Sequence, residues 1–233
     1  MNARLLALAM ACAVSVAAQA QDDDEYRLEI GAGAGLMGYL GDFNGSLSKD
    51  LQPMAAVVAR YIPNPYMAVK MEVGAGTMKG ATDNVTTYYP DYTGHDYTFK
   101  NTLVDVGLAY EYNFLPYGTG RDYRGAKRCT PFVWGGIGLS VAGAKAPGSD
   151  EKKTHAAFSL PLGFGVKYKL GERTNVGAEW AIHFAQSDEL DGVKDPYYIK
   201  SSGLFKNTDC FTTLMVTLTY SFLPKCTTCN KDF

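Results

Sequence analysis

FSLPLGFGVKYKL, residues 158–170, alternates apolar residues with small or charged ones. Because successive side chains of a β-strand point to opposite faces, this stretch predicts a strand with one apolar face. A lipid-facing barrel strand has this pattern, but a strand of a water-soluble β-sandwich has it too, with the core on the apolar side. The export signal, the connections and the aromatic residues decide between the two folds.

The first twenty residues are typical of a cleavable secretion signal. Arg4 supplies a positive charge, residues 5–18 are apolar, and Ala18-Gln19-Ala20 is a small-residue cleavage site. Cys12 would suit a lipoprotein signal, but Ala9-Met10-Ala11 before it is a poor match for one. No later run approaches the ~20 apolar residues that a membrane-spanning helix needs. We therefore expect an exported protein without a helical anchor.

The composition of the chain favours an all-β protein. Gly occurs 25 times, Tyr 16 times and Phe 11 times, which suits strands with close backbone approaches. The formal net charge of −2 gives no sign of a nucleic-acid partner. By length we expect residues 21–233 to form a single domain, in which residues 223–233 are a short C-terminal tail.

The connections between the alternating stretches are themselves alternately short and long. We expect eight strands, near residues 26–38, 53–62, 65–78, 97–114, 131–143, 155–170, 173–186 and 209–222. Outer-membrane barrels have short periplasmic turns and long outer loops. Only residues 115–130 break this rule, as a long connection on the turn side. The sequence thus predicts an eight-stranded antiparallel transmembrane β-barrel of the outer membrane, surrounded by lipid, with both termini in the periplasm.

Aromatic residues gather at the predicted strand ends. Those at the turn side are Tyr61, Tyr66, Tyr112, Phe114, Phe132, Trp134, Tyr168, Tyr220 and Phe222, and Phe158 and Phe184 lie at the other side. Tyr and Phe are also good strand residues, but clustering at one rim favours a girdle at the membrane interface. The last strand ends on Phe222, as the closing strands of such barrels commonly do.

The opposite face of the strands carries charge. By parity we expect the lumen to hold Glu29, Arg60, Lys70, Glu72, Asp105, Glu111, Lys167, Glu179 and His183. An eight-stranded lumen is just wide enough for side chains to fill it, so these charges should pair with one another. A proton or ion path is the alternative, which the filled lumen and the mixed signs disfavour.

Catalytic and cofactor sites find no support. Lipid A deacylases, which are barrels of this size, use a His, a Ser two residues later and a Glu, whereas Ser187 follows His183 by four residues. The Gly-rich runs lie inside strands and do not open helices, so they do not predict phosphate binding. We expect no catalytic residue, no cofactor and no metal.

The cysteines near the C-terminus suggest a disulfide. Cys226 and Cys229 could form a redox or metal dithiol, but two ligands fall short of the four of a structural zinc site. In an oxidising periplasm a structural disulfide is the better expectation, with Cys129 on the same side of the barrel as a further candidate. Cys210 lies at the opposite rim, across a band ~25 Å tall, and should not reach the others.

The order of short motifs along the chain resembles the PorG-like outer-membrane proteins of Bacteroidetes. The motifs are Gly33–Asn44, Arg60–Lys70, Phe99–Leu103, Glu111–Tyr117, Arg124–Arg128, Pro131–Gly138, Gly163–Lys169 and Asp188–Asp191. The resemblance implies that this protein is a component of the type IX secretion system. In that role the barrel would anchor the periplasmic ring proteins of the machine and catalyse nothing.

The partner surface implied by this resemblance is the long turn together with the C-terminal tail. Its candidate residues are Arg121, Arg124, Lys127 and Arg128, which could instead contact anionic lipid or solvent. Two other functions stay open from the sequence: a general small barrel that serves adhesion or envelope integrity, and a lipid-modifying enzyme.

Overall fold

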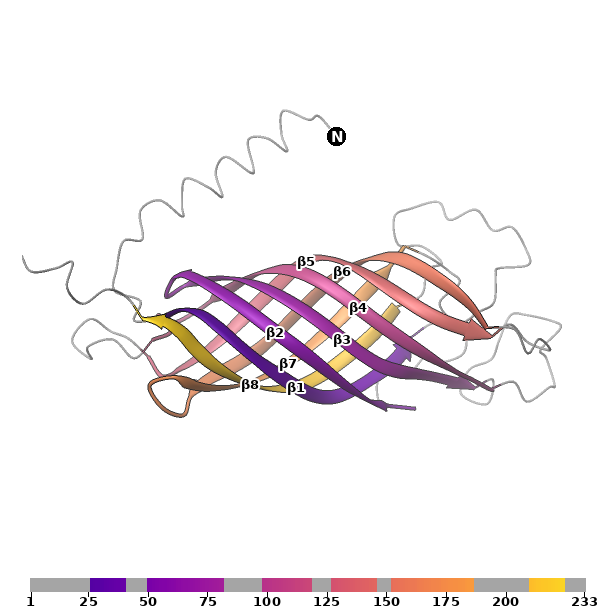
Figure 1. The fold of residues 1–233 in the computed structure, drawn as a ribbon, viewed down its shortest axis with the longest axis horizontal. Coiled ribbons are helices and arrows are strands. Elements are labelled where there is room, and N and C mark those ends of the chain that lie inside the picture. Colours follow the sequence, from indigo (N-terminus) through magenta and orange to yellow (C-terminus); the bar gives the residue numbers. More distant parts are fainter. Residues whose placement is uncertain are drawn as a thin grey trace, which may run out of the picture.

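The chain folds as a single sheet of eight strands (Figure 1). The computed structural model describes residues 26–40, 50–81, 98–118, 127–145, 152–186 and 210–224. The strands are β1 (Tyr26–Leu40), β2 (Gln52–Asn64), β3 (Met67–Ala81), β4 (Thr98–Asn113), β5 (Cys129–Lys145), β6 (Lys152–Lys169), β7 (Thr174–Ala185) and β8 (Cys210–Pro224). None of the described residues belongs to a helix with the length and apolarity that a membrane crossing requires.

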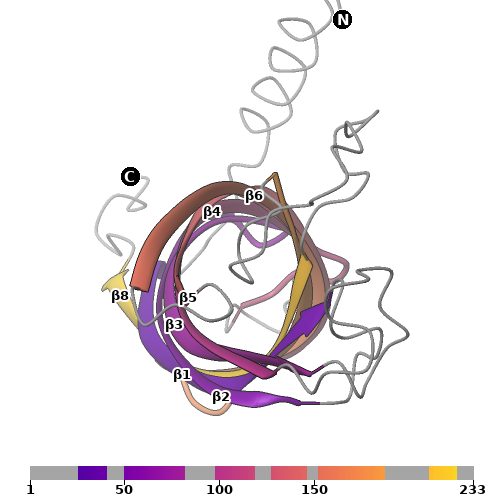
Figure 2. The same ribbon diagram turned by 90° about the vertical axis from the view of Figure 1, so that its right-hand side faces the viewer.

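The sheet closes on itself. Every strand pairs antiparallel with its neighbours in the sequence, and β8 pairs with β1 to complete the ring seen in Figure 2. The closing ladder runs from Tyr26 opposite Pro224 to Leu40 opposite Cys210. A closed sheet leaves no edge of unpaired backbone groups, which lipid could not satisfy. The predicted eight-stranded antiparallel barrel is confirmed.

The two rims of the barrel differ in their connections. We call turn rim the one that holds the start of β1, the end of β8 and the connections 65–66, 114–128 and 170–173, and loop rim the other. On the turn rim, Asn64 Oδ1 accepts a hydrogen bond from Tyr66 N at 2.9 Å, and Thr174 O accepts one from Leu170 N at 3.0 Å. These bonds fix the two tight turns that the sequence predicts.

The strand bounds differ from the predicted ones by at most three residues at any end. The largest differences are at the loop rim, where β3 continues to Ala81 and β6 begins at Lys152. There β6 still pairs with β5, with Lys145 opposite Lys152, so the hairpin extends farther than the alternation of apolar residues.

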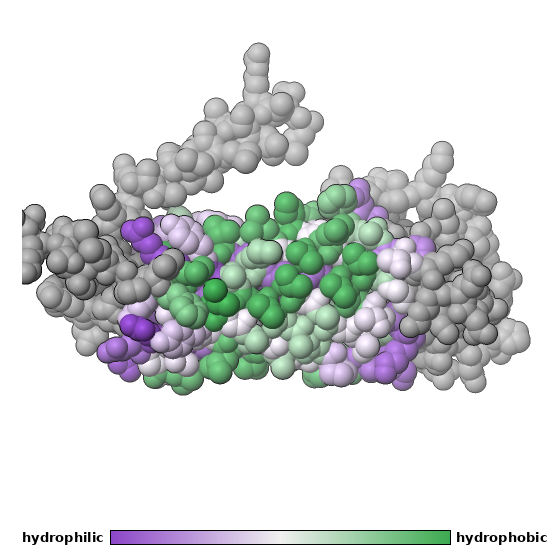
Figure 3. Space-filling view, viewed as in Figure 1, coloured by the Kyte–Doolittle hydropathy of each residue, from purple (hydrophilic) through white to green (hydrophobic). Residues whose placement is uncertain are grey.

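The strands turn apolar side chains outward and polar ones inward. Val166 is 48% exposed and its neighbour Lys167 3%, while Leu218 is 58% exposed and Glu179 4%. On the face that Figure 3 shows, apolar side chains gather along the middle of the barrel, and hydrophilic ones gather toward both ends. An apolar band at mid-height is typical of the lipid-facing surface of a membrane barrel.

The predicted aromatic girdle is correct for seven of its nine turn-rim residues. Tyr61, Tyr66, Tyr112, Phe114, Tyr168, Tyr220 and Phe222 are exposed on the outer surface, but Phe132 and Trp134 are buried in the lumen. The prediction was wrong for these two residues because it used only their position near the end of the strand. The face to which a side chain points is set by alternation along the strand, and both residues lie on the same face of β5 as buried Thr130 and Ser140.

Glycines on the neighbouring strand make room for these two rings. A Cβ at Gly163 would lie 2.6 Å from the indole of Trp134, and a Cβ at Gly165 would lie 2.8 Å from the ring of Phe132. The glycines of β6 are thus the places where β5 aromatics lie flat against the inner wall.

Candidate functional site

The turn-rim half of the lumen is charged. All nine residues that parity assigns to the lumen lie there or at the middle of the barrel, and eight of them are at most 7% exposed; Glu72 is half-buried. They come from six different strands and reach across the interior, so most of these charges face others that are distant in sequence.

Six of these residues form an unbroken chain of ion pairs. Glu111 binds Arg60 Nε at 2.9 Å through one oxygen and Lys167 Nζ through the other. Glu179 lies 3.8 Å from Arg60 Nη2 and 2.9 Å from Lys70 Nζ. Lys70 then reaches Glu72 at 3.0 Å. Signs alternate along the chain, which offsets the cost of removing each charge from water.

The other three predicted lumenal residues lie beside this chain. Glu29 faces Arg60 across the β1–β2 ladder and accepts a hydrogen bond from Thr219 Oγ1 at 3.4 Å. Asp105 accepts hydrogen bonds from Ser140 Oγ at 2.6 Å and Ser159 Oγ at 3.3 Å. His183 Nδ1 lies 3.8 Å from the second oxygen of Asp105.

The loop-rim half of the lumen is mostly apolar, which the sequence analysis did not foresee. Its buried side chains include Met37, Tyr39, Met54, Met78, Leu103, Phe211 and Met215. Methionine is unbranched and flexible and fills irregular gaps, so this layer closes the lumen without a rigid plug. The polar side chains buried in this half of the lumen are uncharged, among them Asn101, Thr212 and Thr213.

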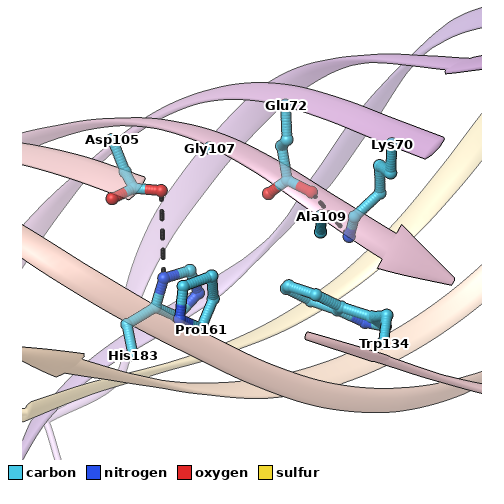
Figure 4. A pocket seen from close by; sticks show the side chains of 8 residues that line it. All are labelled: Lys70, Glu72, Asp105, Gly107, Ala109, Trp134, Pro161 and His183. Carbon is cyan, nitrogen blue, oxygen red and sulfur yellow. Dashed lines mark ion pairs between the residues drawn. The ribbon is translucent and has the colours of Figure 1, made fainter. Parts of the chain in front are cut away.

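A small cavity lies between the two halves (Figure 4). It has a volume of about 10 Å³ and is lined by Lys70, Glu72, Asp105, Gly107, Ala109, Trp134, Pro161 and His183. Lys70 Nζ sits 3.4 Å from the centroid of the Trp134 ring, so the indole covers one side of the ammonium group. The space suits about one water molecule. Since the described side chains around this cavity are buried, they fill most of this part of the lumen.

Tyr117 covers the turn-rim end of the lumen, and periodicity gave no signal for it. The side chain is 3% exposed, and its hydroxyl donates to Asn175 Oδ1 at 3.3 Å. Lys169 Nζ, 5.0 Å from the ring centroid, donates to the same oxygen at 3.0 Å. Burial raises the pKa of Tyr117, so the phenol stays protonated. Lys169 was missed as a lumenal residue, although it shares the parity of Lys167.

The backbone on both sides of the long turn holds Tyr117 in place. Lys127 N donates to Pro116 O at 2.7 Å, and Gly118 N donates to Lys127 O at 3.2 Å. Tyr117 N also donates to Pro65 O at 3.1 Å, which ties this connection to the β2–β3 turn. The connection is thus folded against the turn rim at both of its described ends.

The predicted partner residues lie partly within this structure. Lys127 and Arg128 are exposed on the turn rim, next to the backbone bonds that hold Tyr117. Arg121 and Arg124 lie outside the described residues, as do Cys226, Cys229 and the signal segment 1–20. Cys129 is exposed at the turn-rim end of β5, and Cys210 starts β8 at the loop rim. The disulfide stays a prediction.

A comparison with protein families shows to which family the chain belongs. The sequence profile of a domain of unknown function, DUF6089, matches residues 3–231. The chain belongs to the DUF6089 family. No curated protein matches it.

Solved structures similar to this DUF6089 protein are small outer-membrane barrels. Neisserial surface protein A matches with a TM-score of 0.53 at 14% identity, over 84% of this chain and 97% of that one. OprG of Pseudomonas aeruginosa matches with a TM-score of 0.48 at 12% identity, over 88% of this chain and 99% of that one. Ail of Yersinia pestis, solved with the heparin analogue sucrose octasulfate, matches with a TM-score of 0.47 at 11% identity, over 86% of this chain and 100% of that one. At such identities the likeness concerns the fold, which is that of outer-membrane eight-stranded barrels.

Two lumenal serines of this DUF6089 protein, Ser140 and Ser159, are not arranged as the nucleophile of a catalytic triad. In a Ser-His-Asp triad the hydroxyl binds the imidazole and the carboxylate binds its other nitrogen. Here the hydroxyls of Ser140 and Ser159 both bind Asp105. Among the described residues, no three His, Cys, Asp or Glu side chains are grouped so as to hold a metal ion.

Proposed function

We propose that this protein is a non-enzymatic barrel of the outer membrane that anchors the periplasmic ring of the type IX secretion machinery. The apolar band and the barrel fold support a place in the outer membrane. The resemblance of the motifs from Gly33 to Asp191 to PorG-like proteins supports the secretion role. In this proposal the turn rim and both termini face the periplasm.

The structure of the turn rim is the observation that favours an anchor most. Two connections on this rim, 65–66 and 170–173, are tight turns, so barrel closure needs no more than that. The third, 114–128, is long, and its described ends are folded, with Tyr117 inserted into the lumen and Lys127 and Arg128 exposed beside it. A held backbone that displays cations is suited to steer and register an acidic partner.

A general small outer-membrane barrel is the alternative. In that case Lys127 and Arg128 would contact lipid headgroups, and the outer loops would carry any adhesive or envelope role. The outer loops lie outside the described residues. A lipid-modifying enzyme is disfavoured by the arrangement of Asp105 with Ser140 and Ser159, since neither hydroxyl is bonded to an imidazole.

Charge reversal on the turn rim separates the anchor from the alternative. Lys127→Glu, and the fourfold variant that also reverses Arg121, Arg124 and Arg128, should leave a folded, heat-modifiable barrel. Co-purification of the periplasmic ring proteins should fall in graded steps from the single to the fourfold variant. The matched control is Lys100→Glu, which reverses an exposed charge near the loop rim and should change nothing.

Two results of these experiments would contradict the proposal. If ring proteins co-purify at the wild-type level with the fourfold variant, the turn rim is not their site. Loss of co-purification on deletion of residues 82–96 alone would move the site to the opposite rim.

A further inference from the structure

The cavity beside His183 contains an unusual gap between two buried polar groups. His183 is 3% exposed, and its Nδ1 has no hydrogen-bond partner in the described structure. The nearest acceptor is Asp105 Oδ2 at 3.8 Å, which is too far for a direct hydrogen bond. In Figure 4 both groups face the same space from opposite walls.

The imidazole of His183 cannot turn to close this gap. Its ring stacks on Phe211, with centroids 4.2 Å apart and planes 16° apart, and meets the edge of Trp134 at 6.4 Å. On its other side Nε2 lies 3.3 Å from Thr213 Oγ1. The position of Nδ1 is therefore fixed by packing and by a bond at the far end of the ring.

Asp105 is held just as firmly. Its Oδ1 accepts hydrogen bonds from the hydroxyls of Ser140 and Ser159, which hold the carboxyl group in place. These bonds leave Oδ2 directed at the gap. A separation beyond 3.5 Å between two fixed polar groups next to a cavity of one-water size allows a water molecule in the cavity to bridge them.

We propose that this cavity binds one water molecule, which donates one hydrogen to His183 Nδ1 and the other to Asp105 Oδ2, and that this unit binds one proton. With Nε2–H donating to Thr213, the neutral imidazole offers Nδ1 as an acceptor. After proton uptake, Nδ1–H donates to the water oxygen, and the water still donates to Asp105. The new imidazolium charge is then balanced by the carboxylate at 3.8 Å.

The surroundings of His183 support a single proton site. The titratable groups that face it are Asp105 on β4 and, across the cavity, Lys70 and Glu72 on β3, which pair with each other at 3.0 Å. The other described side chains that line the cavity or bind His183 and Asp105 are uncharged, among them Trp134, Ser140, Ser159, Pro161, Phe211 and Thr213.

Nuclear magnetic resonance of the histidine rings tests this directly, because the chain has only three histidines. In His95→Gln/His155→Gln protein, ¹⁵N-labelled at histidine and reconstituted in lipid nanodiscs, His183 is the only imidazole. We expect a cross-peak between its ring and bound water, and a reversible one-proton titration. Asp105→Asn should weaken proton binding by His183 about tenfold or more, since it removes the balancing charge.

A cavity-filling variant keeps the test independent of folding losses at Asp105. Gly107 lines the cavity, and a Cβ there would meet only ordinary contacts, Ile137 O at 3.7 Å and Asp105 Oδ2 at 3.8 Å. Gly107→Ala should abolish the water cross-peak, whereas Gly143→Ala, outside the cavity, should leave it. An absent cross-peak in the parent protein, or one that survives Gly107→Ala, overturns the proposal.

Discussion

Glu111 is the residue on which the charged layer depends most. It is completely buried and binds two cations, Arg60 and Lys167, that come from strands on either side of the lumen. Neither cation can be released to water without opening the barrel. A neutral side chain at this position therefore leaves buried positive charge without its partner.

We predict that Glu111→Gln lowers the free energy of unfolding by about 3–5 kcal/mol, as expected for the loss of one partner of a buried ion pair. Urea titration of the folded protein in lipid vesicles measures this. The control is Glu172→Gln in the exposed β6–β7 turn, which should stay within about 0.5 kcal/mol of the parent. Equal effects for the two variants would mean that the network does not stabilise the barrel.

The contact between Trp134 and Gly163 gives a second prediction for a single residue. A methyl group at position 163 would lie 2.6 Å from the indole, so Gly163→Ala must displace the ring and should cost about 1–3 kcal/mol. Gly143→Ala, whose new methyl would meet nothing closer than 4.0 Å, is the matched strand control. Unfolding in urea and the fluorescence of Trp134 report on both variants. Unchanged stability in Gly163→Ala would refute the lumenal position of the ring.

Among the elements, the β4–β5 connection departs furthest from a minimal barrel. Its described ends are paired through Pro116, Gly118 and Lys127, and Tyr117 covers the end of the lumen. The described ends of the connection are therefore part of the folded barrel. A force that a partner exerts on Lys127 or Arg128 would be transmitted to β4 and β5.

Two variants of Tyr117 separate packing from hydrogen bonding. Tyr117→Ala should destabilise the protein by about 3–5 kcal/mol because it removes a buried ring. Tyr117→Phe should cost only about 0.5–1.5 kcal/mol, for the bond to Asn175. Thermal unfolding of both variants in detergent gives the comparison. If both match the parent, the connection is not held by this residue.

Periodicity predicted the strands and the lumenal charges because lipid and lumen impose opposite chemistry on alternate residues, as at Val166 and Lys167. It could not place Phe132 and Trp134, since aromatic rings suit the lumen as well as the interface once Gly163 and Gly165 give them room. It also missed the apolar layer: near its loop-rim end β1 places Leu36 outward and Met37 inward, both apolar, so alternation fades. Tyr117 was missed because tertiary packing of a turn has no periodic signal.

For the whole molecule, the filled lumen predicts the absence of a pore. Reconstituted in planar bilayers, the protein should show no large steady conductance, because the described side chains that face the lumen are buried against one another from the charged layer to the apolar layer. A stable conductance of porin size would contradict the filled lumen and remove the basis for a purely anchoring role.

Secretion by the living cell tests the central claim most directly. The gene would be deleted in the native bacterium, and export of cargo with a type IX C-terminal signal would be measured, with the wild-type gene restored on a plasmid as control. We predict that deletion abolishes export, that the wild-type gene restores it, and that the fourfold turn-rim variant does not, although its barrel is folded in the outer membrane. Normal export from the deletion strain would contradict the account and favour a general envelope barrel.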